Sequence, residues 1–373
     1  MSADLTDLQE APAATAEREA PTEAGNEQPA DGTAGKAEEA PEAPPPRPAE
    51  LWHCRQEAWA TLPNGWNSPV QSPEFRHWLV GECVRLRQSS KKARIDALLE
   101  VYTAVALYEG LEHQLHLRTA PDGDGGVYID LADQVGRTAH VSREEWRIIP
   151  RAPAKFYRPP NMKALPQPLR EEADATLLQY LLNLPNESEF RLLLTTCSVA
   201  LLPGKPYPII VFDGQAGAAK TSAARIVRNT LDPNEVPVAG MPRGQDLVSC
   251  AKNNAVIVLD NLSVLPAAVQ DELCRLATGG GLGGRKLYTN VGDASFNASR
   301  PVILTGINNL ATRGDLADRA LPFHLAEVVG RKTDGEIQAG FAPTHTRGCL
   351  PGCSICWLLG SSAWRKCSGG AAR

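Results

Sequence analysis

The sequence predicts an α/β fold with a parallel sheet and flanking helices, and three observations support it. Short apolar runs at Ile209–Phe212, Val256–Leu259 and Val302–Leu304 each end in polar residues. Buried parallel strands have this continuous apolar character. The first run is followed by a glycine-bearing loop and then by a helical pattern through Ile226, Val227 and Leu231. Strand, loop and helix in this order indicate a phosphate-binding loop.

The loop itself reads GQAGAAKT over residues 214–221, close to the P-loop consensus G-x-x-x-x-G-K-[ST]. Ala219 replaces the second consensus glycine, and Gly217 supplies flexibility two residues earlier. Backbone N–H groups and the helix N-terminus would hold the β-phosphate. Lys220 would contact the β- and γ-oxygens, and the Thr221 hydroxyl would ligate Mg²⁺. The predicted nucleotide contacts are Gly214, Gln215, Ala216, Gly217, Ala218, Ala219, Lys220, Thr221 and Ser222.

Composition is typical of a reduced, globular chain of 373 residues. No apolar run is long enough to cross a membrane and no signal-peptide pattern begins the sequence, so we expect a cytoplasmic protein without a membrane partner. Among the nine cysteines, Cys54, Cys83, Cys197, Cys250 and Cys274 are scattered singly, as reduced thiols usually are.

The acidic charge is concentrated at the N-terminus. Residues 1–50 are rich in Ala, Pro and Glu. They hold 12 acidic and 3 basic residues and no aromatic residue. Such a segment buries too little apolar surface to fold, so we expect a disordered tail. Residues 51–373 hold 35 basic and 31 acidic residues, a mildly basic remainder that permits a polyanionic partner without requiring one.

A small α+β domain is predicted over residues 51–157. Ser72-Pro73 is a helix N-terminus, and a second helix spans about Lys91–Glu109. The segments 115–118 and 127–131 flank PDGDGG, a hairpin signal, and a strand is expected near Trp146–Ile149. The clustered tryptophans favour a core role over base stacking.

The remaining domain boundaries follow from composition. A proline-rich connector covers residues 158–172. The P-loop core covers 173–330 and opens with two helices, about Ala173–Leu182 and Ser188–Leu202, which we expect to pack beside the sheet. The leucines at 192–194 suggest that the second is largely buried.

Asp260 ends the second apolar run, where a parallel strand delivers a carboxylate to the edge of the sheet. This is the position of a Walker B aspartate that holds Mg²⁺. The next residue, Asn261, can orient water but cannot accept its proton. Either another carboxylate, Asp246, Asp271 or Glu272, acts as the base, or hydrolysis is slow.

Further polar groups follow along the chain. The third apolar run places Thr305 or Asn308 near the γ-phosphate, as a sensor strand does. A glycine loop projects Arg285 and Lys286, which would either grip single-stranded nucleic acid or belong to a structural hairpin. Arg313 and Arg319 are candidates for an arginine finger acting on a neighbouring subunit, the alternative being a surface ion pair with Asp315 or Asp318.

A family resemblance rests on the segments GQAGAAKTS, VIVLDNLSVLP, DELCRLATGGG, RKLYTN, RPVILTGI and LATRGDLADRA. Together they resemble phage- and mobile-element-type ATP-binding proteins, related to AAA+ and superfamily-3-helicase-like ATPases and found alongside replication primases. The resemblance covers about residues 72–330. It implies an AAA+-like core, ATP with Mg²⁺ as the cofactor, a homo-oligomeric ring, and Arg319 ahead of Arg313 as the finger.

The tail over residues 331–373 departs from this pattern. His345, Cys349, Cys353 and Cys356 have spacings that suggest a zinc site, but there is no second paired half. We favour a frameshifted or truncated tail in place of the amphipathic helices that the resemblance implies.

Three functions remain after the sequence is read. The first is a helicase-like or replication-associated ATPase acting on DNA, with single-stranded DNA and a primase as possible partners. The second is a nucleotide-gated binding module or loader that hydrolyses weakly, which Asn261 favours. A P-loop kinase is third, because no acceptor base is evident.

Overall fold

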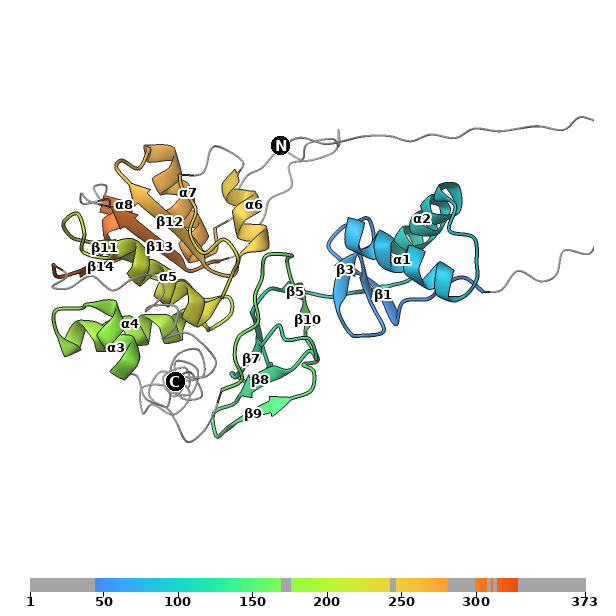
Figure 1. Cartoon of the computed structure of the whole chain (residues 1–373), viewed down its shortest axis with the longest axis horizontal. Coiled ribbons are helices and arrows are strands. Elements are labelled where there is room, and N and C mark those ends of the chain that lie inside the picture. Colours follow the sequence, from blue (N-terminus) through green and yellow to red (C-terminus); the bar gives the residue numbers. More distant parts are fainter. Residues whose placement is uncertain are drawn as a thin grey trace, which may run out of the picture. The chain divides into compact units, whose positions relative to one another are not determined.

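The computed structural model describes residues 44–168, 176–241, 246–280, 299–306, 310 and 314–327. The described residues from Pro45 onward belong to one compact unit. Figure 1 shows its helices and strands along the chain. Most of the predicted N-terminal tail lies outside the described residues, and the first strand begins at Glu50.

A parallel sheet confirms the fold class at the level of mixed α/β architecture. Its strands are β11 (Ile209–Asp213), β12 (Ile257–Leu262), β13 (Val302–Gly306) and β14 (Ala320–His324). Their order is β12-β13-β11-β14, and every neighbouring pair is parallel. The three apolar runs are β11, β12 and β13, as predicted, whereas β14 was not predicted.

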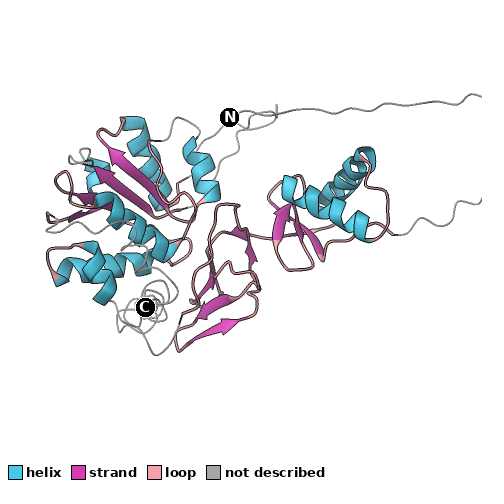
Figure 2. Ribbon diagram, in the orientation of Figure 1, coloured by secondary structure: helices cyan, strands magenta, loops and turns pink. Residues whose placement is uncertain are grey.

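Helices cover both faces of this sheet (Figure 2). Ile210 and Phe212 share a core with α3 (Thr176–Leu182), α4 (Glu187–Ala200) and α5 (Lys220–Leu231). Ile209 and Val211 face α6 (Asp246–Asn253), α7 (Ala267–Thr278) and α8 (Gly314–Ala317). This alternation along β11 is what a strand buried on both faces requires.

The predicted first helical layer is therefore confirmed, with one correction. Leu193 and Leu194 of α4 are buried, but Leu192 is 44% exposed. Three successive residues of a helix point in directions about 100° apart, so one of them must leave the core face.

The N-terminal sheet has the order β3-β2-β1-β4. Its strands are β1 (Glu50–Cys54), β2 (Glu57–Thr61), β3 (Asn67–Pro69) and β4 (Leu111–Glu112). Helices α1 (Pro73–Arg85) and α2 (Lys92–Tyr108) pack in a core with β2 and confirm the two predicted helices. The Ser72 hydroxyl accepts the Phe75 N–H at 3.1 Å, as the predicted N-cap requires.

A second sheet, with order β6-β7-β8-β9, is an antiparallel meander. It contains β6 (Thr119–Pro121), β7 (Val127–Asp130), β8 (Thr138–Val141) and β9 (Trp146–Ile149). The predicted hairpin exists, but the strand entering it is β6 and not 115–118. Leu115–His116 forms β5 instead, which pairs in parallel with β10 (Lys155–Phe156).

The Asp122 side chain explains this shift in the hairpin. Its Oδ1 atom accepts the N–H groups of Asp124 and Gly126, at 2.9 and 2.6 Å. The turn therefore begins at Asp122, and the three residues before it supply the partner strand. Arg118 leaves the strand path altogether, because its guanidinium is buried against Asp232.

This second sheet shares an apolar cluster with α3, α4 and α5 through Val127, Ile129 and Val141. The segment after β10 joins the same core at Leu165, and the Lys163 N–H donates to the Pro233 carbonyl at 2.8 Å. The domain boundaries drawn from composition stay predictions.

No helix among the described residues is long and apolar enough to cross a membrane. In the same part of the chain Cys54, Cys83, Cys197, Cys250 and Cys274 are free thiols, as predicted.

Candidate nucleotide-binding site

The loop after β11 has the backbone of a tight anion-binding turn. Gly214 and Gly217 have φ angles of 137° and 87°, which glycine adopts without strain. A Cβ atom on Gly214 would lie 2.9 Å from the Leu325 carbonyl oxygen, so a side chain there would collide with the chain after β14. The sequence placed its glycines where the fold needs them.

Ala219 occupies the left-handed region, with φ 59° and ψ 29°, immediately before α5. This explains why the consensus has glycine at this position: the conformation costs a residue with a Cβ about 1–2 kcal/mol.

Helix α5 begins without a capping side chain at Ala219. The first N–H groups of any α-helix lack partners within the helix, and alanine cannot accept them. The helix dipole adds partial positive charge at the same end. These N–H groups therefore face the loop as a ready anion site.

Lys220 lies directly over this site. Its Nζ atom donates to the carbonyl oxygens of Gly214 and Gln215, both at 2.7 Å. Both partners described for this ammonium group are neutral carbonyls, and the charge of an incoming anion would attract it more strongly than a carbonyl dipole does.

Asp260 contacts the same end of α5 from β12. The Thr221 hydroxyl donates to its carboxylate, with distances of 2.9 and 3.1 Å to Oδ1 and Oδ2. These residues are 39 positions apart, and the sequence predicted that both would ligate Mg²⁺. A hydroxyl and a carboxylate are oxygen ligands of the kind that Mg²⁺ takes. The chemistry of the pair fits that ion.

Thr305 connects this pair to the middle strand. Its hydroxyl donates to Asp260 Oδ1 and accepts the Asn261 N–H, the latter at 2.9 Å. Because β13 lies between β11 and β12, Thr305 bridges the loop strand and the aspartate strand. The structure thus brings together Lys220, Thr221, Asp260 and Thr305.

Asn261 is exposed and has a φ of 57°. The register of β12 against β13 shifts between Leu259 and Leu262, so Asn261 lies outside the regular ladder. Left-handed conformations in non-glycine residues are concentrated at functional sites. Asn261 therefore follows Asp260 just outside the regular ladder, and its predicted role stays a prediction.

An open depression of about 570 Å³ lies beside Asp260 and Asn261. The segments 238–241 and 262–266 form its walls, mostly with apolar side chains. Ala239 pairs with Leu259 in a single parallel bridge, so this depression follows the outer edge of β12. Its volume is in the range of small-molecule sites.

Of the three proposed bases, Asp271 and Glu272 both lie in α7. The hydrogen bonds that the structure describes at the Asp260 carboxylate come from Thr221 and Thr305. The side chain of Asp246 lies outside the described part.

Arg319 lies far from the loop of its own chain. It immediately precedes β14, whose first residue pairs with Ile209 at the start of β11, whereas the loop follows the end of β11. Five residues of β11 separate the two edges, about 16 Å at about 3.3 Å per residue. The Arg319 guanidinium donates to the Asp315 main-chain oxygen at 2.6 Å, and not to the carboxylate that the surface-pair alternative names.

Sequence reasoning missed one pair at the mouth of the loop. Asp213 and His324 end β11 and β14, and His324 Nδ1 lies 2.8 Å from Asp213 Oδ1. The short segment ALPFH gives no strong strand signal, because proline interrupts it. Only the parallel pairing of β14 with β11 places this histidine beside the loop.

Several predicted site residues fall outside the described residues: Arg285, Lys286, Asn308, Arg313, His345, Cys349, Cys353 and Cys356. The glycine-loop, second-sensor, finger and zinc predictions that rest on them stay predictions.

Residues 175–351 match the family described as the actinomycete integrative conjugative element replication protein. The matched segment includes the loop, Asp260 and Thr305. It supports the prediction of a replication-associated protein of a mobile element. A search of curated proteins found no match.

Among solved structures, the chain is similar to the A form apo structure of the NrS-1 C-terminal region, with 13% identity and a TM-score of 0.48. That alignment covers 85% of this chain and 67% of the other. A second NrS-1 structure, of residues 305–718, has 11% identity, a TM-score of 0.47, and coverages of 87% and 69%. NtrX from Brucella abortus in complex with ADP has 16% identity, a TM-score of 0.24, and coverages of 38% and 37%.

Proposed function

We propose that this chain is an ATP-binding P-loop ATPase of AAA+-like type, a helicase-like or replication-associated motor of a mobile element. One observation carries the proposal. Thr221 at the start of α5 and Asp260 at the end of β12 meet within 2.9 Å, beside the Lys220 ammonium and the uncapped helix. This arrangement at one edge of a parallel sheet supports a phosphate cradle beside a pair of magnesium ligands.

Each residue has a distinct role in this proposal. The loop N–H groups and Lys220 hold the β- and γ-phosphates, while Thr221 and Asp260 hold the Mg²⁺ shell. Bound Mg²⁺ neutralises charge that develops on the phosphate oxygens. Thr305 positions the Asp260 carboxylate and, through the Asn261 N–H, fixes the strand end where water must approach.

Arg319 is proposed to act in trans. Its position at the opposite edge of the sheet prevents it from serving its own loop, so a finger role requires a neighbouring copy in a homo-oligomeric ring. Single-stranded DNA and a primase are the partners proposed for such a ring.

A nucleotide-gated binding module is the second candidate, and Asn261 favours it. The position after Asp260 holds an amide in place of a carboxylate, so the proton of the attacking water has no acceptor there. Such a module would bind ATP tightly, hydrolyse it slowly, and load a replication partner.

Steady-state ATP turnover by the full chain, with and without single-stranded DNA, tests the proposal. Lys220→Ala removes the phosphate contact, and Lys205→Ala is the control because Lys205 is an exposed lysine before β11. An ATPase motor shows turnover that DNA stimulates, that Lys220→Ala abolishes and that Lys205→Ala retains. Tight ATP binding with turnover equal to Lys220→Ala indicates the gated module. Absence of ATP binding refutes both candidates.

A further inference from the structure

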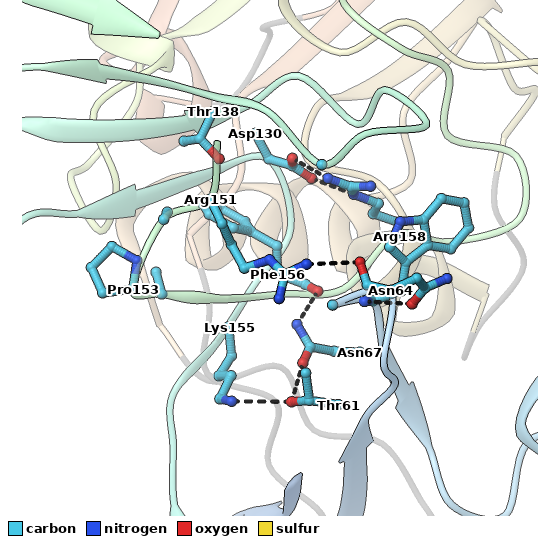
Figure 3. Close-up of a pocket in the computed structure, with 15 residues that line it drawn as sticks. Thr61, Asn64, Asn67, Asp130, Thr138, Arg151, Pro153, Lys155, Phe156 and Arg158 are labelled. Carbon is cyan, nitrogen blue, oxygen red and sulfur yellow. Dashed lines mark hydrogen bonds and ion pairs between the residues drawn. The ribbon is translucent and has the colours of Figure 1, made fainter. Parts of the chain in front are cut away.

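A second polar pocket lies outside the nucleotide site and outside the residues that match the family. It has a volume of about 70 Å³ and lies between the turn after β2 and the segment around β10 (Figure 3). Most of its lining comes from two stretches that are far apart in the sequence, 61–67 and 151–158, and residues between 130 and 138 complete it. These lining residues include Thr61, Asn64, Trp66, Asn67, Asp130, Arg151, Lys155 and Arg158.

Positive charge predominates in this pocket. Three cations line it, Arg151, Lys155 and Arg158, against the single carboxylate of Asp130. Arg158 is bonded to Asp130 through two N–H groups, at 2.8 and 2.6 Å. Arg151 instead donates to the Asn64 carbonyl at 2.8 Å, so among the hydrogen bonds described its partner is neutral.

Lys155 also extends toward the same space. Its Nζ atom donates to the Thr61 hydroxyl at 3.0 Å and forms an ion pair with the Glu50 carboxylate, which does not line the pocket. Asn67 donates its amide N–H to the Phe156 carbonyl at 2.9 Å and accepts from Thr61. Arg158 and Lys155 are thus each paired with a carboxylate, and Arg151 is the lining cation whose described hydrogen-bond partner is a neutral carbonyl.

Trp66 differs from the neighbouring tryptophans. Trp52 and Trp59 are 0% and 2% exposed, whereas Trp66 is 41% exposed. The first two confirm the predicted core role, and Trp66 does not. The Arg158 guanidinium lies 5.3 Å from the centre of the Trp66 ring.

The turn that carries Trp66 is held rigidly. The Leu62 N–H donates to the Trp66 carbonyl at 2.8 Å, and the Trp66 N–H donates to Asn64 Oδ1 at 3.0 Å. Gly65 has a φ of 83°, and a Cβ there would lie 1.9 Å from the Arg151 guanidinium carbon. The turn thus carries the exposed Trp66 directly after Gly65, the residue against which the Arg151 guanidinium lies.

We propose that this pocket is a contact site for single-stranded DNA, in which Arg151 binds a backbone phosphate and Trp66 stacks on an adjacent base. The pocket holds several water-sized groups, which suits a phosphate but leaves the base outside, on the exposed ring. Stacking accepts any base, and the cations follow the backbone. This contact does not depend on nucleotide hydrolysis at the P-loop.

Equilibrium binding of fluorescein-labelled dT20 to the full chain without nucleotide provides the test. Trp66→Leu keeps apolar bulk and removes the π-face, and should weaken binding by about 5- to 150-fold. Trp66→Phe should retain most of the affinity. Arg151→Ala should lower the slope of log K against log salt by about 0.7, the value for one phosphate contact on a single strand.

Arg147→Ala is the matched control, because Arg147 is an exposed arginine of β9 that does not line the pocket. Each variant is checked for an unchanged thermal midpoint. Wild-type affinity and salt slope in both Trp66→Leu and Arg151→Ala would overturn the inference, as would equal losses in Trp66→Phe and Trp66→Leu. ATP turnover on the same preparations separates it from the proposed ATPase: DNA binding that needs Trp66 stands even where turnover is absent.

Discussion

The parallel sheet and the two N-terminal sheets place their polar groups in different ways. In the parallel sheet, β11, β12 and β13 all end at one edge, so Asp260, Thr305 and the loop after Asp213 meet there. In the mostly antiparallel sheets neighbouring strands end at opposite edges. The pocket beside Trp66 is therefore formed mainly by connections, the turn after β2 and the distant segment around β10. A parallel sheet therefore collects strand-end residues into one site, whereas the other sheets rely on their connections.

The regions are joined by a buried ion pair, which gives the largest predicted effect. The Asp232 carboxylate accepts two N–H groups of Arg118, at 3.0 and 2.9 Å, and also the Ala255 N–H at 3.1 Å. Both charged side chains are 1% exposed. Asp232→Ala leaves the buried Arg118 guanidinium without its carboxylate partner, so we expect the free energy of unfolding to fall by about 3–5 kcal/mol. Urea unfolding of the full chain measures it.

The control for this change is Asp96→Ala. Asp96 pairs with Arg76 on the surface of the N-terminal module, with side chains 40% and 39% exposed. Its loss should cost less than about 1 kcal/mol. Equal effects of the two substitutions would show that Arg118 and Asp232 do not join the regions.

The next largest expected effect is a pH dependence of stability caused by His116, which lies in β5. Burial, with a smaller contribution from the Arg300 charge, lowers the pKa of His116 from 6.5 to about 4. Above pH 6.5 the imidazole is neutral in both states. Between pH 6.5 and 4 the unfolded chain gains a proton that the folded chain does not, so stability falls as the pH falls, by up to about 3 kcal/mol.

His116→Gln should remove this part of the pH dependence while leaving stability at pH 8 close to wild type. Unfolding midpoints between pH 8 and 4 measure it. An unchanged pH profile in His116→Gln would assign the acid sensitivity to other groups.

Thr305→Val tests how the edge of the parallel sheet is held together. Valine has nearly the same shape but leaves the partly buried Asn261 N–H without its acceptor and Asp260 without one donor. We expect a loss of about 1–3 kcal/mol by thermal or urea unfolding. Thr195→Val is the control: among the hydrogen bonds described, the Thr195 hydroxyl donates to the Arg191 carbonyl within α4, so this substitution should change stability little. Equal small effects would mean that Thr305 does not hold the site.

The smallest predicted effect is at Ala219. Ala219 has a left-handed backbone, and glycine at this position would relieve about 1–2 kcal/mol of strain in the folded state. The greater conformational freedom of glycine in the unfolded chain partly offsets this gain. Ala219→Gly should therefore stabilise the chain by up to about 1 kcal/mol. Ala223→Gly, in the interior of α5, should destabilise it by about 1 kcal/mol. A destabilised Ala219→Gly would show that its methyl group has packing that outweighs the strain.

Sequence patterns predicted the parallel region well because a continuous apolar run is a local signal for a buried strand. The polar residues that end such runs, here Asp260 and Thr305, are expected to lie close together because parallel strands end at the same edge of a sheet. Strand β14 was missed because ALPFH is short and contains proline, and His324 was missed with it. The pairing that defines them involves a strand about 110 residues earlier.

The N-terminal module shows the opposite limit. Its helices were predicted from a capping serine and from periodicity, but β1 and β2 were not predicted. In the structure these strands pair across Trp52 and Trp59, whose rings stack. The buried Arg118–Asp232 pair joins residues 114 positions apart, and no local pattern marks it. The exposure of Trp66 is likewise a property of one turn and not of tryptophan spacing.

The central claim is that Lys220, Thr221 and Asp260 form a magnesium-dependent nucleotide site, and calorimetric titration with ATP, with Mg²⁺ and with EDTA, tests it most directly. Mg²⁺ should raise the affinity of the wild-type chain by at least about tenfold, about 1.4 kcal/mol. Thr221→Val should bind ATP with nearly the same affinity in both conditions, because the phosphate cradle remains while one ligand is lost. ATP binding that ignores Mg²⁺ in the wild type, or that survives Lys220→Ala unchanged, would contradict the account.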